Sequence, residues 1–293
     1  MEISNEHIND KFERAMGEAI SSLLFQPPPP TFIHPSRHIW LKTSTGSTIP
    51  AFYLDRSAPV TLLFSHGNAE DLGMIYDWFV DLSRVLGVNV MCYDYTGYGK
   101  SRGGTGMPSE ENVYADVDAA YSYLTDTLNI HPSTIVLYGR SLGSGPSCYI
   151  AEKSALSNSP VGGLILQSPL LSAYRVAFNF RFTLIGDKFP NVDRACNVKS
   201  PVFVIHGTQD EVVPFWHGQE LFEGVGVEWR AKPFWVLGAG HNNIESVLRQ
   251  TGAFVDHLAE FLDIHVKART DWKGKKEVLK VQDAVERAMQ KTA

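Results

Sequence analysis

Residues 134–147 read TIVLYGRSLGSGPS, and this stretch decides how the rest of the chain is interpreted. The apolar run from Ile135 to Tyr138 is typical of a buried strand. It leads directly into GRSLG at residues 139–143, and small residues that are compatible with a helix follow. This order predicts a strand, a sharp turn and a helix, with the Ser141 hydroxyl held clear of the sheet by a strained backbone. Glycine is expected at positions 139 and 143, because a side chain at either position would crowd the turn.

Such a turn presents a serine as a nucleophile, but the five-residue pattern is weak by itself and occurs twice. Residues 99–103 read GKSRG, yet no apolar strand runs directly into this copy and no helical run leaves it. We therefore expect Ser101 to be an ordinary loop serine. The corresponding alternative for Ser141 is a buried turn serine. It is disfavoured because the structural context that the motif requires is present on both sides.

The composition is typical of a globular protein that can bury a sizeable core. The 293 residues are 44% hydrophobic and 20% charged, and the net charge of −6 implies no general attraction to nucleic acid. The three scattered cysteines suggest neither a disulfide framework nor a zinc site. No apolar run reaches the roughly 18 residues of a membrane span. The polar, acidic first 14 residues are unlike a secretory signal, so we expect an intracellular protein that is not secreted.

The sequence divides the chain into three parts. Residues 1–30 are expected to form an amphipathic helix and a proline-rich spacer, and residues 31–266 an α/β domain. Residues 267–293 begin with basic side chains and then carry apolar residues at helical spacing, which predicts a basic helical tail. Both terminal helices are expected to pack on the domain or face solvent. The alternative is peripheral contact with the cytoplasmic face of a membrane. No oligomeric state is predicted.

The middle part alternates between strands and helices. Residues 36–54 predict an antiparallel strand pair around a turn at residues 44–47. Short, continuously apolar runs then alternate with helical runs, as expected for strands that are covered on both faces. Together these features predict an α/β fold with a doubly wound, mostly parallel sheet, N-terminal antiparallel strands and a short cap segment. The apolar strands are expected at residues 60–64, 88–93, 135–138, 161–166, 202–205 and 234–237.

The segment at residues 168–199 is longer than a plain crossover and rich in aromatic residues. Two interpretations are equally favoured. It is either a connecting helix packed in the core, or a small cap that lines a pocket for an acyl chain.

A serine hydroxyl needs a neighbouring base to act as a nucleophile at neutral pH. In a doubly wound α/β fold with a nucleophilic serine on such a turn, a carboxylate and then a histidine follow the serine along the chain. Asp210 lies in the loop after the strand expected at residues 202–205, and His241 in the loop after the strand expected at residues 234–237. Because ligands bind beyond the carboxyl ends of parallel strands, all three side chains are expected at one edge of the sheet. We predict Ser141 as nucleophile, His241 as base and Asp210 as acid.

Other residues compete for two of these roles. Glu211 could be the acid, with Asp210 as an ordinary turn or cap aspartate. Asp94 also ends a strand, but it precedes the serine and is expected to brace the loop that follows it. His66 and His206 stand directly at strand ends before glycine, where a histidine usually bonds to the backbone and supports a turn.

Attack on a carbonyl creates an oxyanion, which preorganised N–H donors must stabilise. One donor is expected to be the backbone N–H of Leu142, directly after the serine. The other is expected from the loop that reads SHGNAED at residues 65–71. Gly67 would let this backbone turn tightly, so that the N–H of Asn68 faces Ser141. The alternative is an ordinary strand-to-helix turn.

Three strings carry a family resemblance. HGNAEDLG at residues 66–73, YDYTGYGKS at residues 93–101 and YGRSLGSGP at residues 138–146 resemble one branch of the serine α/β-hydrolase superfamily, which includes the eukaryotic protein depalmitoylases of the abhydrolase-17 type. The resemblance extends from about Phe32 to about Leu262, and it implies the α/β-hydrolase fold and hydrolysis of thioesters between long acyl chains and protein cysteines. Asp210 and His241 fall where the branch places its acid and base. Animal members carry a lipidated N-terminal cysteine cluster, whereas the first cysteine here is Cys92.

The residues and the resemblance together predict a serine hydrolase that cleaves acyl esters or thioesters through an acyl-enzyme, without metal or cofactor. The resemblance implies protein depalmitoylation. The expected partners are an acylated protein or a small acyl ester, and no nucleic acid. The alternatives are a general carboxylesterase or serine peptidase on the same fold, and a catalytically silent binding protein. An epoxide hydrolase or dehalogenase is excluded, because either would need an aspartate in place of Ser141.

Overall fold

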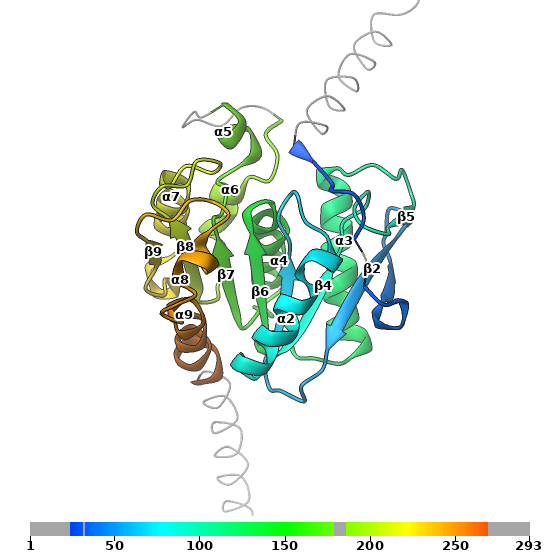
Figure 1. Ribbon diagram of the computed structural model, residues 1–293, viewed down its shortest axis with the longest axis horizontal. Helices are drawn as coiled ribbons and strands as arrows, with labels where there is room; N and C mark the ends of the chain where they lie inside the picture. The colour runs from blue at the N-terminus through cyan, green and yellow to red at the C-terminus, as the bar shows by residue number, and fades with distance from the viewer. Residues whose placement is uncertain (1–23, 32, 179–185, 269–293) are drawn as a thin grey trace, which may run out of the picture.

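The computed structural model describes residues 24–31, 33–178 and 186–268. Within them one sheet runs through the molecule in the strand order β1-β2-β4-β3-β6-β7-β8-β9, with β5 paired to β2 (Figure 1). The pairs β1–β2 and β2–β4 are antiparallel, and every later pair along this path is parallel. The predicted fold class, a mostly parallel sheet with N-terminal antiparallel strands, is confirmed. The strands are β1 (Ile39–Lys42), β2 (Ser47–Leu54), β3 (Thr61–Ser65), β4 (Asn89–Tyr93), β5 (Arg102–Gly103), β6 (Ile135–Arg140), β7 (Gly163–Gln167), β8 (Val202–Gly207) and β9 (Phe234–Val236).

Helices cover both faces of this sheet (Figure 1). One buried apolar cluster joins the sheet to α2 and α9, and a second joins its other face to α3, α4, α6 and α7. The described helices are α2 (Leu72–Leu86), α3 (Glu110–Ser122), α4 (Ser144–Leu156), α5 (Ala173–Phe178), α6 (Asn191–Ala195), α7 (Trp216–Gly224), α8 (Ile244–Leu248) and α9 (Ala253–Phe261). Shorter 3-10 segments lie at residues 35–37, 132–134, 141–143 and 227–229, and π-helical turns extend α3 over residues 123–127 and α9 over residues 262–267.

The two-sided core explains why the strand sequences are apolar without alternation. Successive side chains of a strand point to opposite faces. In β3, Leu62 and Phe64 belong to the cluster under α2, whereas Leu63 belongs to the cluster under α3 and α4. All three are almost completely buried. Continuous apolar strands therefore follow from the doubly wound arrangement.

Local sequence signals set the ends of the helix that follows β3. Asp71 is the N-cap of α2 and its side chain accepts a hydrogen bond from the N–H of Met74, a typical capping interaction. Gly87 ends the helix with φ of 61°, in the left-handed region that glycine adopts at little cost. The start of α2 therefore lies directly after the loop at residues 66–71, which holds one of the predicted oxyanion donors.

The predicted terminal helices fall almost entirely on residues 1–23 and 269–293, which lie outside the described residues. The proposed division into residues 1–30, 31–266 and 267–293 therefore stays a prediction. Among the helices that the structure describes, none combines the length and the apolar character needed to cross a bilayer.

Asp116 of α3 gives the fold a pH-dependent stability. Its carboxylate is fully buried and accepts hydrogen bonds from the N–H of Thr96 (2.7 Å) and the hydroxyl of Thr96 (2.8 Å). Burial raises the pKa of Asp116 to about 7, and the two hydrogen bonds only partly offset this effect. Between an ordinary aspartate pKa of about 4 and this raised value, the folded protein holds a proton that the unfolded chain has lost.

The free energy of unfolding is therefore expected to fall as the pH rises from about 4 to 7, by up to about 1.4 kcal/mol per pH unit from this group alone. Asp116→Asn removes the titration, while its amide can still accept from the N–H and donate to the hydroxyl of Thr96. Urea unfolding at several pH values gives the free energy of unfolding of wild type and variant. The difference between these two free energies should change as the pH rises from about 4 to 7. An unchanged difference would contradict the assignment.

Candidate active site

Ser141 lies at the tip of the turn between β6 and α4, as the sequence predicts. Its φ is +52°, a left-handed conformation that is uncommon for a residue with a side chain. The two glycines permit a very close approach of backbone segments. A Cβ on Gly139 would lie 2.4 Å from the carbonyl oxygen of Gly143, and a Cβ on Gly143 would lie 1.9 Å from that of Ser65. Both positions therefore require glycine for the reason expected from the motif.

His241 lies in the loop after β9 and reaches the serine. Its Nε2 is 3.0 Å from Oγ of Ser141, and its Nδ1 is 2.8 Å from Oδ2 of Asp210. The carboxylate of Asp210 can only accept, so Nδ1 carries the hydrogen and Nε2 is left to accept from the serine hydroxyl. The three residues that the sequence singled out are thus connected by hydrogen bonds, although Ser141 and His241 are 100 positions apart.

Asp210 lies in the loop after β8 and its side chain is completely buried. Its Oδ1 accepts hydrogen bonds from the backbone N–H groups of Val212 (2.9 Å) and Val213 (2.7 Å). Burial by itself would raise the pKa of Asp210. Hydrogen bonds from His206, His241 and Val213 outweigh that effect and hold the pKa well below its usual range. The carboxylate is therefore ionised and fixed in orientation beside the imidazole.

The competing residues occupy other positions. Oε2 of Glu211 accepts from the backbone N–H of His241 (3.4 Å) and not from its ring. Nδ1 of His66 donates to the carbonyl of Gly67 (2.7 Å), as expected for a histidine that supports a turn. Asp94 accepts from the N–H of Leu72 (2.9 Å), so it braces the start of α2 as well as the loop expected from the sequence. These side chains have roles that differ from those of acid and base.

The remaining two competing residues are Ser101 and His206. Ser101 lies in a loop, and its Oγ accepts from the N–H of Gly97 (2.8 Å). His206 donates from Nε2 to the carbonyl of Val213 (2.9 Å), as expected, but the same nitrogen also lies 3.2 Å from Oδ2 of Asp210. This second contact was not predicted from the sequence. The only local signal for it is that His206 and Asp210 are four residues apart in the same strand-to-loop segment.

The donor loop, residues 66–71, follows β3 and lines the same cavity as Ser141. Oε2 of Glu70 accepts the N–H of Gly67 (2.7 Å), so this N–H is not available to an oxyanion. A Cβ on Gly67 would lie 2.9 Å from that oxygen, and Gly67 is not in the left-handed region. A larger residue at position 67 would therefore have to displace the end of the Glu70 side chain, and the backbone there has a conformation that other residues can adopt. Asn68 and Leu142 both line the cavity at Ser141, which keeps their N–H groups as candidate oxyanion donors.

The side chain of Asn68 ties the donor loop to an N-terminal segment. Its Oδ1 accepts from the N–H of Gln26 (2.9 Å) and from the hydroxyl of Tyr98 (2.7 Å), and its Nδ2 donates to the carbonyl of Leu24 (2.6 Å). Phe25, between these two residues, is buried against Phe189. Residues 24–26 therefore form part of the site, a contribution for which the sequence offered no pattern.

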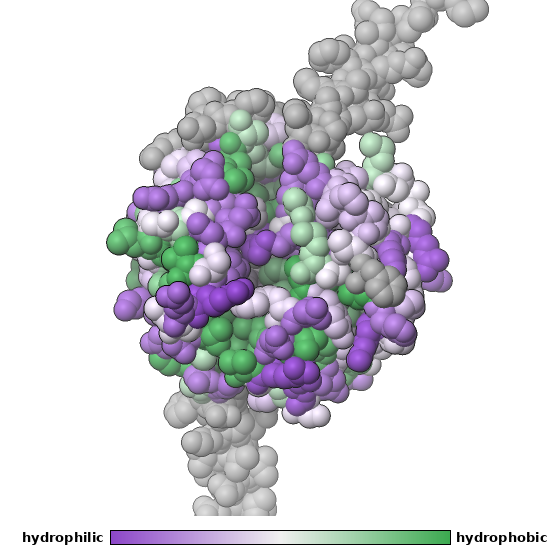
Figure 2. Space-filling view, viewed as in Figure 1, coloured by the Kyte–Doolittle hydropathy of each residue, from purple (hydrophilic) through white to green (hydrophobic). Residues whose placement is uncertain are grey.

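A cavity of about 610 Å³ opens at Ser141 and His241. The surface in Figure 2 is hollowed near the middle of the face drawn, where hydrophilic and hydrophobic residues meet. Four residues of the predicted cap segment line the cavity, whereas Phe189 of the same segment is fully buried in the core. The described part of residues 168–199 thus contributes both to the core and to the wall of this cavity, and its role as an acyl pocket stays a prediction. The apolar lining consists of Leu24, Ala69, Met74, Leu142, Leu170, Ala173, Val176, Ala177, Val212 and Val213.

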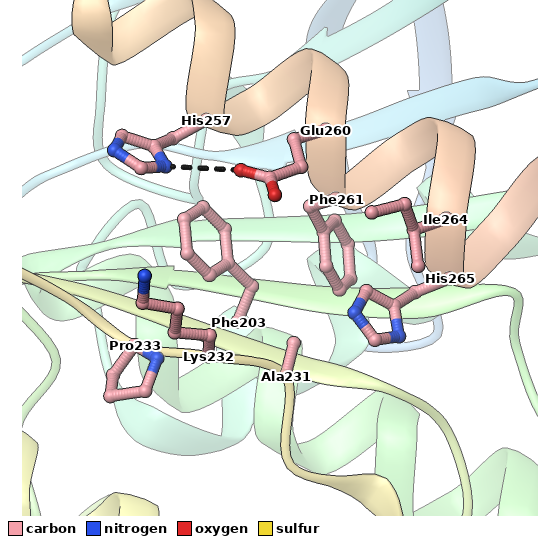
Figure 3. Close-up of a pocket in the computed structure, with 9 residues that line it drawn as sticks. All are labelled: Phe203, Ala231, Lys232, Pro233, His257, Glu260, Phe261, Ile264 and His265. Atoms are coloured by element: carbon pink, nitrogen blue, oxygen red, sulfur yellow. Dashed lines mark ion pairs between the residues drawn. The ribbon is translucent and has the colours of Figure 1, made fainter.

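A second cavity, between β8 and α9, has a different character (Figure 3). It measures about 50 Å³ and has Phe203 stacked on Phe261 in its wall. His257 pairs with Glu260 at its edge (3.4 Å). This volume holds little more than water. In the part of the chain that the structure describes, no group of three or more histidine, cysteine or acidic side chains is arranged to hold a metal ion.

Comparisons with known proteins agree with this architecture. The model of the serine aminopeptidase S33 family matches residues 57–192. The chain is 41% identical over 224 residues to alpha/beta hydrolase domain-containing protein 17B of Xenopus laevis, which covers 75% of this chain and 73% of that protein. It is 43% identical over 205 residues to protein 17C of Mus musculus, covering 69% and 61%. An esterase of Pyrococcus furiosus has a similar fold, with a TM-score of 0.64 at 16% identity over 82% of this chain and all of that one.

Proposed function

This chain belongs to the α/β-hydrolase family, in the branch that contains the alpha/beta hydrolase domain-containing proteins 17B and 17C, and we propose that it cleaves acyl thioesters and esters through Ser141, His241 and Asp210. The observation that carries the proposal is the hydrogen-bonded chain of these three side chains, with Ser141 and His241 in the lining of a largely apolar cavity. The family membership establishes a hydrolase. The catalytic roles and the substrate are our proposal.

The geometry supports an acyl-enzyme mechanism. His241 accepts the proton of the Ser141 hydroxyl at Nε2 while Oγ attacks the substrate carbonyl. The N–H groups of Asn68 and Leu142 stabilise the oxyanion, and Asp210 stabilises the imidazolium. The tetrahedral intermediate collapses, the C–S or C–O bond breaks, and the proton passes to the leaving thiol or alcohol where needed. His241 then activates a water molecule that releases the acid and restores the serine.

The cavity favours an acyl chain as the group that is recognised. Its volume lies within the range of roughly 300–1,000 Å³ that is typical of ligand pockets, and most of its lining residues are apolar. Burial of a chain against this wall supplies binding free energy in proportion to the apolar area removed from water. We propose palmitoylated protein cysteines as the substrate, in an intracellular setting that is cytoplasmic or peripheral at the cytoplasmic face of a membrane.

The name of the matching family model raises an aminopeptidase as the second candidate. Such an enzyme needs a carboxylate that is free to bind the substrate ammonium group. Among the described residues that line the cavity, the one acidic side chain is that of Glu70. It is already bound to Arg140 and to the N–H of Gly67. This arrangement favours an acyl substrate over a free peptide N-terminus.

A series of acyl thioesters and p-nitrophenyl esters from acetyl to palmitoyl tests the proposal, with peptide amides measured beside them. We expect kcat/KM to rise with chain length by up to about fourfold for each methylene that enters the cavity. Amides should be turned over far more slowly than thioesters. A preference for amides, or a preference for acetyl over every longer chain, would contradict the proposed substrate class.

A further inference from the structure

Arg140, the residue directly before Ser141, has its guanidinium between two carboxylates, one from the donor loop and one from the start of α8. Its Nη2 donates to Oε1 of Glu70 in the donor loop. Its Nη1 lies 3.6 Å from Oε1 of Glu245, in the first turn of α8 and four residues after His241. We call this set of three residues, Arg140, Glu70 and Glu245, the Arg140 bridge. It connects the nucleophile turn, the donor loop and the segment that follows His241.

On the donor-loop side, the bridge ends on the backbone next to the predicted oxyanion donor. Glu70 uses one oxygen for Arg140 and the other for the N–H of Gly67 (2.7 Å), directly before Asn68. The carboxylate is largely buried, with 10% of the side chain exposed. Its position therefore sets the path of the backbone from Gly67 into Asn68.

On the histidine side, the bridge is fixed to the sheet. Oε1 of Glu245 also accepts from Nε2 of Gln167 at the end of β7 (2.8 Å). Gln167 in turn accepts from the hydroxyl of Tyr138 in β6 (2.5 Å). Both of these partners are buried in the rigid part of the fold. The start of α8, and with it the loop of His241, is therefore tied through Gln167 of β7 to β6, the strand that carries the nucleophile.

Arg140 lines the cavity, so the alternative is that it binds an anionic group of the substrate. The charges argue against this alternative. One guanidinium faces two carboxylates, so the bridge carries an excess of negative charge and offers no net attraction to an anion. Nη2 of the guanidinium already donates to Glu70 and Nη1 faces Glu245 at 3.6 Å, whereas a site for anions needs these nitrogens directed at the ligand.

We infer that Arg140 is a positioning residue. By holding Glu70 and Glu245 next to the nucleophile turn, it aligns the N–H of Asn68 and the ring of His241 with Ser141. The inference rests on the proposed function, because alignment has meaning only if these groups catalyse. It extends that function to three residues that do not touch the reacting atoms. A misplacement of about 1 Å at a catalytic group can cost about 100-fold in rate.

The test compares Arg140→Met, Arg140→Lys, Glu70→Gln and the double variant Glu70→Gln/Arg140→Met with wild type on one acyl thioester. We expect Arg140→Met to lower kcat by about 10–100-fold with little change in KM, since the substrate is still bound but the donors are displaced. Arg140→Lys keeps the charge and should recover part of kcat. The double variant should lose no more than the worse single variant, because the residues act as one unit. Arg84→Met, which removes an exposed pair with Asp81 (3.4 Å), is the matched control and should equal wild type.

Three results would overturn the inference. The first is wild-type kcat in Arg140→Met, and the second is a rise in KM at unchanged kcat, which would make Arg140 a substrate-binding residue. The third is a loss of kcat that matches the loss of folded protein in thermal unfolding for every variant. Failure of the proposed function would give a different result, namely a Ser141→Ala variant that is as active as wild type. That result would refute the catalytic assignment, although the contacts of the Arg140 bridge would still be present.

Discussion

Replacement of Ser141 by alanine is expected to lower kcat for acyl thioester hydrolysis by roughly 10⁴–10⁶-fold. The variant keeps the cavity, the oxyanion donors and His241, so substrate binding should survive while the covalent step is lost. A folding defect is not expected, because alanine lacks only the hydroxyl whose described partner is Nε2 of His241. Steady-state rates with equal amounts of folded wild type and variant give the measurement.

Ser101 provides the matched control for this variant. It occupies the second copy of the five-residue pattern, but it lies in a loop and bonds to the N–H of Gly97. Ser101→Ala should therefore retain activity within a few-fold of wild type. If Ser101→Ala removed activity and Ser141→Ala did not, the sequence pattern would have been assigned to the wrong copy.

Replacement of Asp210 by asparagine is expected to lower kcat by about 10³–10⁴-fold. Three N–H donors point at the present carboxylate, those of His241, Val212 and Val213, and Nε2 of His206 lies 3.2 Å from its Oδ2. An amide offers one acceptor oxygen and turns its own NH₂ toward some of these donors. It also removes the negative charge that stabilises the imidazolium, so the ring of His241 loses both its orientation and its preferred tautomer.

The low pKa of Asp210 determines the pH range over which Asp210→Asn should differ from wild type. Since the folded-state pKa is held well below its usual range, the wild-type carboxylate stays ionised at mildly acidic and neutral pH. The loss in Asp210→Asn should thus be seen across that whole range and not only at one pH. Glu211→Gln, which alters the competing acid, should cost less than about 10-fold, because Glu211 contacts the backbone of His241 and not the ring. The reverse ranking of the two variants would reassign the acid.

The parts of the site that the sequence predicted depend on local patterns at strand ends. Ser141 was recognisable because an apolar strand, two glycines and a helix surround it within 14 residues of sequence. Asp210 and His241 could be proposed because parallel strands all present their carboxyl ends at one edge, so residues after β8 and β9 lie at the same edge of the sheet as the end of β6. The structure brings these side chains within hydrogen-bonding distance, while their catalytic roles stay predictions.

The parts that the sequence did not predict depend on contacts between distant segments. Arg140 and Glu70 are 70 positions apart, and Asn68 meets Leu24 across 44 positions. Nothing near any of these residues marks its partner, because the contact exists only once the sheet has placed the loops. The aromatic residues at 168–199 were ambiguous for a related reason. A phenylalanine such as Phe189 satisfies a core and a pocket equally well, and its position in the fold decides between them.

The most direct test of the proposed catalytic site is covalent labelling with a fluorophosphonate, followed by mass spectrometry of the digested protein. The reagent phosphonylates only a serine that is activated by its neighbours. We expect one adduct on the peptide that contains Ser141, slow labelling in Asp210→Asn and none in Ser141→Ala. An adduct on any other residue, or full labelling of Ser141→Ala, would contradict the proposed site.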